Sequence, residues 1–195
     1  MKCAAVICAA GAGSRMGQNK ALCHIGTRTF LDFIVRTLLD VTTEIKPIVV
    51  VTGAEAEAVR RIHADLPVVW AHNDAWRTTY MLESLVCGLA CVPDECDVIH
   101  WPVDCIGVSA GDIARLLEVP REFVSVLGVG GIPGHPVRFT AEMLHELRTP
   151  GNGFRSLRDF FSLYPCKVVE SSEPVLMNCN DPQSLADFIA RRAKL

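Results

Sequence analysis

The sequence lacks an apolar run that could cross a bilayer, a C-x-x-C pair and an excess of positive charge. A membrane-spanning helix needs about 20 consecutive apolar residues, so we expect no membrane association. The net charge of −3 argues against a general nucleic-acid surface, so any positive site must be local. The first residues carry one lysine and a short apolar run broken by Gly11, unlike a signal peptide, and we expect a cytoplasmic protein.

Nine cysteines are present, but their spacing contains no repeated pair of the kind that binds zinc. We expect Cys3, Cys8, Cys87 and Cys91 to be small buried hydrophobic residues. Thiols in a cytoplasmic protein stay reduced. Neither a zinc site nor a disulfide framework is therefore expected.

Apolar runs that predict strands alternate with helical patterns along the 195 residues. Strands are predicted at 3–8, 47–51, 66–71, 97–101 and 123–127. Helices are predicted at 29–40, 55–64, 80–91, 109–118 and 182–193. Continuous apolar strands separated by helices predict a parallel sheet covered on both faces, here in one domain over 1–195. In such sheets, ligands bind outside the carboxyl ends of the strands.

Residues 9–20, AAGAGSRMGQNK, directly follow the first predicted strand. Gly11 and Gly13 let the backbone turn sharply and leave its amides open to a ligand. Successive amides in such a turn form a concavity that suits an anion. Arg15 adds a planar fork that matches phosphate oxygens, and Lys20 adds a compact positive charge. The segment therefore predicts a loop that binds a polyphosphate.

Two other glycine-rich motifs fit this loop less well. A P-loop ends in Gly-Lys-Ser/Thr, whereas QNK follows Gly17. A dinucleotide-binding fingerprint needs a glycine where Met16 stands and an acidic residue after the second strand, which instead continues into Thr52. A nucleotidyltransferase loop is the third interpretation.

The pattern AAG-x-G-x-R-M-G-x-x-K resembles the signature of nucleotidyltransferases with a glycosyltransferase-A-like fold, and most closely the branch of the molybdenum cofactor cytidylyl- and guanylyltransferases. Later segments resemble the same branch in the same order: NDAW with Met81 and Ser84, the strand at 97–104 that ends in P-x-D, GIPGHPVRF at 131–139, GNGFR at 151–155 and NCNDPQSL at 178–185. The resemblance covers nearly the whole chain. It implies an α/β fold, a three-layer Rossmann-like nucleotidyltransferase domain with a mostly parallel central sheet.

The resemblance also implies a reaction. A phosphorylated acceptor attacks the α-phosphorus of a nucleoside triphosphate, and pyrophosphate leaves. Arg15 would cradle the terminal phosphates, Lys20 would offset charge near the α-phosphate, and Asp104 would complete the catalytic set. The nucleotide-binding residues would be Ala9, Ala10, Gly11, Ala12, Gly13, Ser14, Thr79 and Ser84. For Thr79 and Ser84, a purely structural role where a helix begins is the alternative.

Mg²⁺ is the implied cofactor, with Asp104 and Asn180 as its ligands. A carboxylate that ends a buried strand either caps a helix or binds such a hard cation. The family usually carries acids where this chain has Asn178 and Asn180, and an uncharged amide oxygen holds Mg²⁺ less strongly. Asp181, one residue later, would cap the final helix. Tyr80 replaces a glycine of the family and would narrow the pocket or stack on the base.

The acceptor side is implied by His135 and Arg155, although His135 has the alternative role of fixing its turn. Ala-Ala-Gly before the loop resembles the pyrimidine-using branch, because the Cβ of Ala10 would crowd a purine, and CTP is therefore favoured. The G-H-P-V element favours a molybdopterin-type acceptor. A sugar- or polyol-phosphate nucleotidyltransferase of the same fold is one rival. A non-catalytic nucleotide-binding relative with a weakened metal site is the other.

Overall fold

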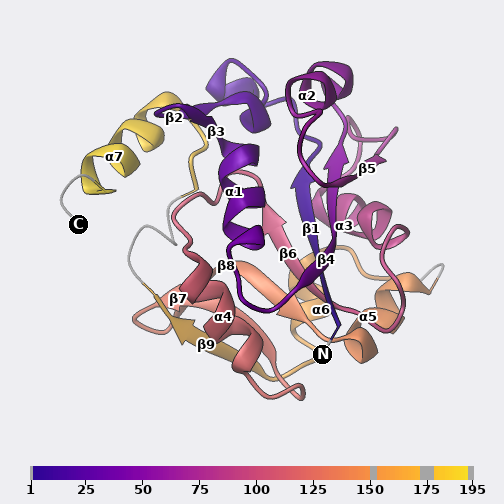
Figure 1. Cartoon of the computed structure of the whole chain (residues 1–195). Helices are drawn as coiled ribbons and strands as arrows, with labels where there is room; N and C mark the ends of the chain where they lie inside the picture. Colours follow the sequence, from indigo (N-terminus) through magenta and orange to yellow (C-terminus); the bar gives the residue numbers. More distant parts are fainter. Residues whose placement is uncertain (1, 150–152, 172–177, 193–195) are drawn as a thin grey trace.

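The computed structural model describes residues 2–149, 153–171 and 178–192, which form a seven-stranded sheet with helices on both faces (Figure 1). The strands follow the order β5-β4-β1-β6-β8-β7-β9 across the sheet. Their bounds are β1 Cys3–Ala9, β4 Ile45–Thr52, β5 Val69–His72, β6 Asp97–Pro102, β7 Val124–Val129, β8 Ile132–Phe139 and β9 Cys166–Glu170. A separate short hairpin consists of β2 His24–Ile25 and β3 Arg28–Thr29.

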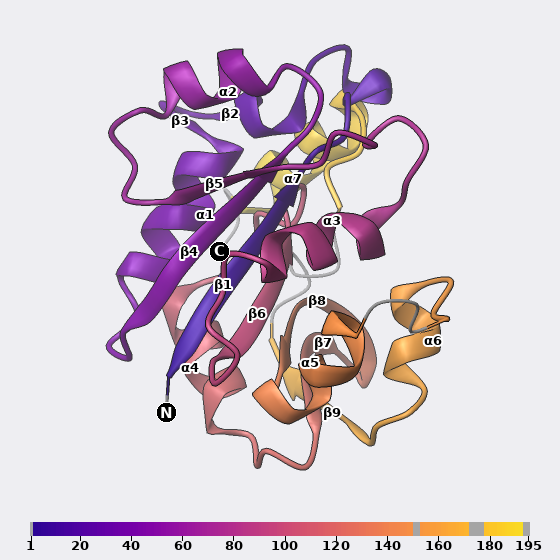
Figure 2. The same cartoon turned by 90° about the vertical axis from the view of Figure 1, so that its right-hand side faces the viewer.

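The sheet is parallel except at β8, which runs antiparallel to both β6 and β7. The helices are α1 Phe30–Leu39, α2 Ala56–Ile62, α3 Met81–Leu89, α4 Ala110–Glu118, α5 Ala141–Arg148, α6 Leu157–Phe161 and α7 Pro182–Arg192. Figure 2 shows α1 and α4 on one side of the sheet and α3 and α5 on the other. The prediction of a three-layer, mostly parallel α/β domain is therefore confirmed.

Strand β1, an interior strand of the sheet, contributes alternate residues to the two hydrophobic cores of the protein. Its alternate residues Cys3, Ala5 and Ile7 pack with α1 and α4, while Ala4, Val6 and Cys8 pack with α3. Small side chains on β1 allow the helices to approach closely. Gly88 of α3 marks the tightest approach, since a Cβ there would lie 2.5 Å from Val6 Cγ1 and 2.8 Å from Val51 Cγ2.

The helices and strands predicted from the sequence are present, with small shifts at their ends. The third strand begins at Val69 rather than at residue 66, and residue 193 of the predicted last helix lies outside the described residues. No predicted element corresponds to β2, β3, β8, β9 or α5. The helix that the resemblance places at Arg155 begins two residues later, as α6 at Leu157. The structure describes no helix that is both long and apolar enough to cross a membrane.

The expectation for the cysteines needs a correction. Cys3 and Cys8 are buried, but Cys91 is exposed and Cys87 is only half-buried. Cys87 lies on the flank of α3, where its thiol donates to the carbonyl of His72, and Cys91 follows the end of that helix. A position near a helix end therefore exposes these two thiols.

The close packing of Gly88 generates a stability prediction. We expect Gly88→Ala to lower the free energy of unfolding by about 1–3 kcal/mol, because the added methyl group overpacks the contact with Val6 and Val51. The matched control is Gly111→Ala in α4, where the nearest atom to a new Cβ is 3.7 Å away. This control should change stability by less than about 1 kcal/mol, in the stabilising direction. Urea unfolding of both variants tests this, and equal stability would contradict the packing argument.

Candidate active site

The loop after β1 is shaped by two glycines with different tasks. Gly13 has a φ of 64°, and a Cβ on it would collide with the carbonyl oxygen of Gln18. The backbone conformation therefore requires glycine at position 13, because residues with a side chain rarely adopt a positive φ. Gly11 has no atom within 4 Å of the place a Cβ would occupy. Its open surface is available for a ligand.

Both ends of the loop are tied to Ala54, which follows β4. The amide of Ala54 donates to the carbonyl of Ala10 at 2.9 Å. At the other end, the fully buried Asn19 donates through Nδ2 to the Ala54 carbonyl at 2.8 Å and accepts the amide of Ala21 at 2.9 Å. Asn19 therefore fixes the backbone from which Lys20 projects. This role of Asn19 could not be predicted from the sequence, because its partner lies 35 residues away.

Asp104 follows β6 in a turn that a buried tryptophan holds. Trp101 donates through its indole Nε1 to the carbonyl of Cys105 at 2.7 Å, and the amide of Cys105 donates to Pro102 at 3.1 Å. The amide of Val103 bonds to the carbonyl of Cys8, at 3.2 Å. The turn is thus fixed against the end of β1, where the loop begins.

Residues 178–180 pair with the same turn and bring Asn180 to the site. Cys105 and Asn178 form an antiparallel bridge, and the amide of Cys179 donates to the Asp104 carbonyl at 3.0 Å. The side chain of Asn178 accepts from the Cys105 thiol at 3.1 Å. Asp181 accepts the amide of Ser184 at 2.8 Å and so caps α7, as predicted. Asn180, and not Asn178, faces the charged site.

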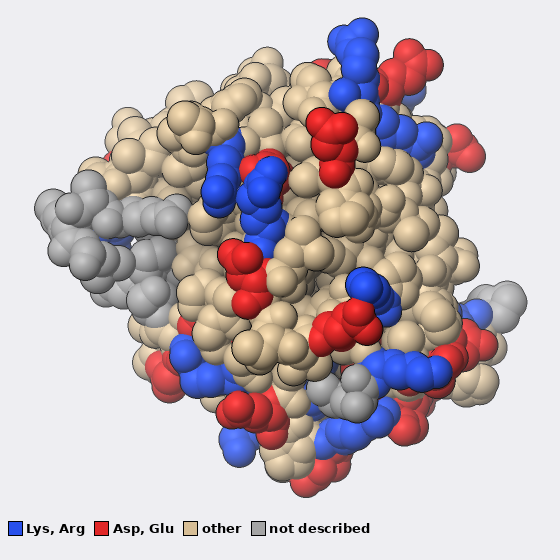
Figure 3. All heavy atoms as spheres, viewed as in Figure 1, with Lys and Arg blue, Asp and Glu red and all other residues tan. Residues whose placement is uncertain are grey.

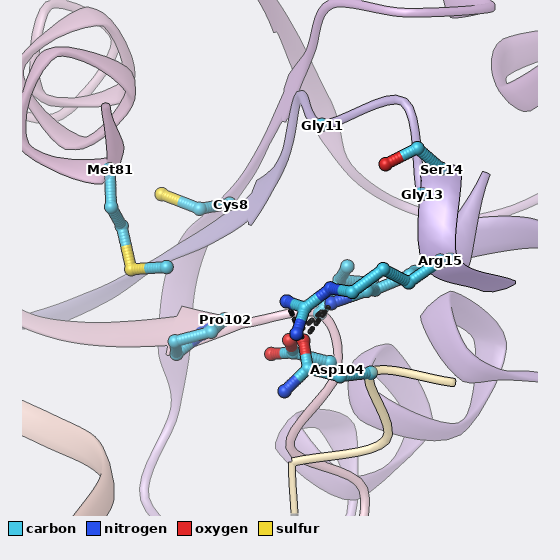
Figure 4. Close-up of a pocket in the computed structure, with 11 residues that line it drawn as sticks. Cys8, Gly11, Gly13, Ser14, Arg15, Met81, Pro102 and Asp104 are labelled. Carbon is cyan, nitrogen blue, oxygen red and sulfur yellow. Dashed lines mark hydrogen bonds and ion pairs between the residues drawn. The ribbon is translucent and has the colours of Figure 1, made fainter. Parts of the chain in front are cut away.

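Four side chains that are distant in sequence converge here (Figure 4). Lys20 Nζ lies 2.7 Å from Asp104 Oδ2 and 2.6 Å from Asn180 Oδ1. Arg15 Nη2 donates to the same Asn180 oxygen at 3.1 Å. The side chains of Lys20 and Asp104 are only 17% and 15% exposed, so their ion pair is largely shielded from water. The predicted catalytic residues thus lie together, on one ligand-sized site.

A cavity of about 210 Å³ opens at this point, lined by Cys8, Gly11, Gly13, Ser14, Arg15, Lys20, Met81, Pro102, Val103, Asp104 and Asn180. In Figure 4, Arg15 reaches from the loop toward Asp104, while Met81 and Cys8 lie across the cavity. The lining contains two cationic side chains and one carboxylate. In contrast, the face of the described chain in Figure 3 shows both charge signs interspersed, without an extended basic patch. The cavity lining itself has more positive than negative side chains, Arg15 and Lys20 against Asp104.

The oxygen atoms at the site suit a hard divalent cation. Asp104 offers a carboxylate and Asn180 an amide oxygen, and Mg²⁺ is commonly held by one or two such protein groups together with substrate phosphates. The part of the chain that the structure describes contains no cluster of three His, Cys, Asp or Glu side chains placed as metal ligands. A metal at this site would therefore complete its shell with oxygen atoms from water or from a phosphate.

Several residues with predicted nucleotide contacts do not line this cavity. Asn73 Nδ2 donates to Thr79 Oγ1 at 3.0 Å and to Ser84 Oγ at 3.1 Å. These contacts fit the alternative in which Thr79 and Ser84 have a purely structural role at the start of a helix. Ala9 and Ala10 are buried beside the loop, and Ala12 is exposed. Tyr80 is 78% exposed and lies outside the lining, so its ring does not narrow the cavity. Its neighbour Met81 lines the cavity instead.

A second cavity of about 580 Å³ adjoins the first through Met81, which lines both. Its other lining residues are Val126, Pro133, Gly134, His135, Ser156, Leu157, Arg158, Phe161 and Cys166. His135 is therefore placed on this side, as expected. Arg155 does not line this cavity, and its amide donates to Asp159 before α6 begins. Arg158, the second residue of α6, lines the cavity instead.

Both histidines at the back of the site are uncharged at neutral pH. Burial lowers the pKa of His100 to about 3. Burial also lowers the pKa of His135, and the charge of Asp104 only partly opposes this effect. The two rings meet edge to face at 5.9 Å, and the buried Nδ1 of His135 has no hydrogen-bond partner within the described chain. His135 thus presents a neutral imidazole to the second cavity.

Solved proteins, among them two that are named as nucleotidyltransferases, share this fold over nearly the full length of the chain. A nucleotidyl transferase from Methanothermobacter thermautotrophicus has a TM-score of 0.81 at 22% identity, with 99% of this chain and 98% of that chain covered. 2-C-methyl-D-erythritol 4-phosphate cytidylyltransferase from Thermus thermophilus has a TM-score of 0.75 at 20% identity, with 100% of both chains covered. A Mycobacterium tuberculosis H37Rv protein in complex with manganese has a TM-score of 0.74 at 19% identity, with 97% and 99% covered.

The sequence matches one relative over a short segment and one family model over most of the chain. A stretch of 67 residues is 43% identical to the bifunctional protein GlmU of Alkalilimnicola ehrlichii. It takes in 33% of this chain and 14% of GlmU, so the chain spans a small part of that relative. The model of the MobA-like NTP transferase domain matches residues 5–168, which include the first loop, Asp104 and His135. This match and the shared fold show that the chain belongs to the MobA-like NTP transferase domain family and is a nucleotidyltransferase.

Proposed function

We propose that the chain transfers CMP from CTP to a phosphorylated small molecule of the molybdopterin type, with Mg²⁺ as cofactor and pyrophosphate as the second product. The observation that carries the proposal is the convergence of Arg15 and Lys20 with Asp104 and Asn180 on one cavity. A second, more apolar cavity beside it offers a place for the acceptor. The rivals are a sugar- or polyol-phosphate acceptor and a non-catalytic nucleotide-binding role.

The residues of the first cavity align the triphosphate and neutralise the charge on its phosphates. These two effects supply most of the catalysis in phosphoryl- and nucleotidyl-transfer reactions. The amides of the loop at 11–14 and the guanidinium of Arg15 hold the terminal phosphates. Lys20 places its ammonium group beside the α-phosphate, where negative charge develops. A divalent cation bound by Asp104 and Asn180 would add positive charge on the phosphate oxygens. One solved relative contains manganese, which supports a divalent cation.

The second cavity accounts for the other substrate. A phosphate nucleophile is already ionised at neutral pH, so the reaction needs no general base. The neutral His135 lines the acceptor cavity with the accessible part of its side chain, whereas its Nδ1 is buried. Arg158 meets the acceptor's negative charge, and apolar side chains such as Leu157 and Phe161 cover its body.

The preference for CTP rests on two observations. Ala9, Ala10 and Gly11 form the Ala-Ala-Gly element that resembles the pyrimidine-using branch, although Ala10 is buried and does not line the cavity. One relative of the same fold is a cytidylyltransferase by its name. The non-catalytic alternative is motivated by Asn180, because its amide oxygen carries no charge.

The first prediction concerns the nucleotide. With Mg²⁺ present, we expect CTP to raise the melting temperature more than ATP, GTP or UTP do. Ligand at 100 times its Kd stabilises by about 2.7 kcal/mol, which corresponds to roughly 5–10 °C for a chain of this size. Equal shifts with all four nucleotides would contradict the preference. Tight binding of CTP without pyrophosphate release, with any metal and any phosphorylated acceptor, would establish the non-catalytic role.

The second prediction concerns catalysis. Lys20→Ala and Asp104→Ala should each lower kcat by about 10²–10³-fold, since a single positioned charge is commonly worth a few kcal/mol in the transition state. Lys2→Ala removes a lysine from an exposed ion pair with Glu95 and should leave kcat unchanged. Pyrophosphate release measures the rates, and circular dichroism verifies folding. Near-wild-type turnover in either cavity variant would refute the assignment.

The third prediction separates two arginines of one segment. Arg158→Ala should raise the KM for the acceptor about tenfold, because a hydrogen bond to a charged group is worth about 1.5–3 kcal/mol. The KM for CTP should change little. Arg155→Ala is the matched control and should change neither constant. If Arg155→Ala instead raises the acceptor KM, the acceptor lies outside the second cavity.

A further inference from the structure

The ammonium group of Lys20 contacts the same two oxygen atoms that would hold a divalent cation. Its Nζ lies 2.7 Å from Asp104 Oδ2 and 2.6 Å from Asn180 Oδ1. The Asn180 oxygen also accepts from Arg15 at 3.1 Å. The other Asp104 oxygen, Oδ1, has only a weak contact with the Cys105 thiol at 3.7 Å. In the structure, a cationic side chain therefore occupies the position at which these two oxygen atoms would bind a metal.

Lys20 and a divalent cation exclude each other from this position. Mg²⁺ requires its oxygen ligands at about 2.0–2.1 Å, so a cation bound to both oxygens would lie within the space of the ammonium group. Charge adds to the steric conflict, because the pair is largely shielded from water and like charges repel strongly there. The charged residues in the cavity lining, Arg15, Lys20 and Asp104, sum to +1 (two cations, one anion). A free divalent cation therefore approaches a positive site.

We propose that Lys20 acts as an internal cation at this position, so that the divalent cation enters the site only together with the triphosphate. The inference rests on the proposed function, because it takes a triphosphate as the ligand of the cavity. When the triphosphate binds, the flexible stem of Lys20 lets its ammonium group move from Asp104 to a phosphate oxygen. Asp104 Oδ2 is then free to bind the metal. No covalent bond changes in this step. The contact between Lys20 and Asp104 is lost, and Lys20 then contacts a phosphate while Asp104 contacts the metal.

Asn180 makes this competition sharper in this chain. With a neutral amide at 180, Asp104 is the single carboxylate of the cavity lining, and Lys20 neutralises it. The incoming triphosphate reverses the sign of the cavity charge and so raises the affinity for the metal. By linkage, the metal must raise the affinity for the triphosphate by the same factor. Lys20 thereby couples the two ligands.

The test measures Mn²⁺ binding to the full chain by electron paramagnetic resonance of the free ion, with and without the unreactive analogue α,β-methylene-CTP. For the wild type, the analogue should lower the Kd for Mn²⁺ at least tenfold. Lys20→Gln should bind Mn²⁺ about tenfold more tightly than the wild type when no nucleotide is present. The effect of the analogue on Mn²⁺ binding should become smaller in this variant. Lys20→Met provides a second variant, and thermal melts verify that both are folded.

Arg15→Gln is the matched control, since it removes one positive charge from the same cavity but leaves the contact between Lys20 and Asp104. It should raise the affinity for Mn²⁺ by less than about threefold. Adding Asp104→Asn to Lys20→Gln should abolish the gain. The proposal is overturned if Lys20→Gln and Lys20→Met leave Mn²⁺ binding unchanged, if Arg15→Gln matches their gain, or if the wild type binds Mn²⁺ equally with and without the analogue.

The same measurements separate this proposal from the proposed function. The coupling is supported if Lys20→Gln binds Mn²⁺ more tightly and the analogue lowers the Kd for Mn²⁺ in the wild type. This holds even if no tested acceptor leads to pyrophosphate release. In that case the proposed transfer reaction fails alone. An active cytidylyltransferase whose Lys20 variants gain no Mn²⁺ affinity would overturn the competition and leave the transfer reaction standing.

Discussion

The parallel pairing of β1 with β6 is the constraint on which the site depends. The two strands are neighbours in register, with Cys8 beside Pro102, so their carboxyl ends lie at one edge of the sheet. Whatever follows these strands must meet there. The glycine loop follows β1, the turn with Asp104 follows β6, and the amide of Val103 joins the two through Cys8. The contact between Lys20 and Asp104 is a consequence of this topology rather than of local sequence.

Two sets of elements form two cavities at this edge of the sheet. Charged and glycine residues around β1 and β6 form the smaller cavity, whereas β7, β8 and α6 supply most of the larger and more apolar one. Burial keeps His135 uncharged at the back of the larger cavity. Under the proposed function, phosphate transfer and recognition of the acceptor would therefore take place in different physical environments, although the two cavities share Met81.

Much of this arrangement could be predicted from sequence because its signals are local. The apolar runs predicted the order of helices and strands, and the loop at 9–20 predicted a phosphate site from its own glycines and cations. β8 could not be predicted in this way, since its sequence IPGHPVRF, with two prolines and a glycine, is typical of a turn. Asn19 depends on a distant carbonyl, and the choice between Arg155 and Arg158 depends on where a five-residue helix begins. Tertiary contacts decide such cases.

Met81 is the one residue that the two cavity linings, as described, have in common. It stands at the first position of α3, and its unbranched thioether chain adapts to neighbours of different shape. Substitutions in β8 or α6 can therefore remodel one chamber while the residues around β1 and β6 stay as they are. If the larger cavity binds the acceptor as proposed, this separation would give the scaffold evolutionary modularity, because mutations could change the acceptor without changing the smaller cavity.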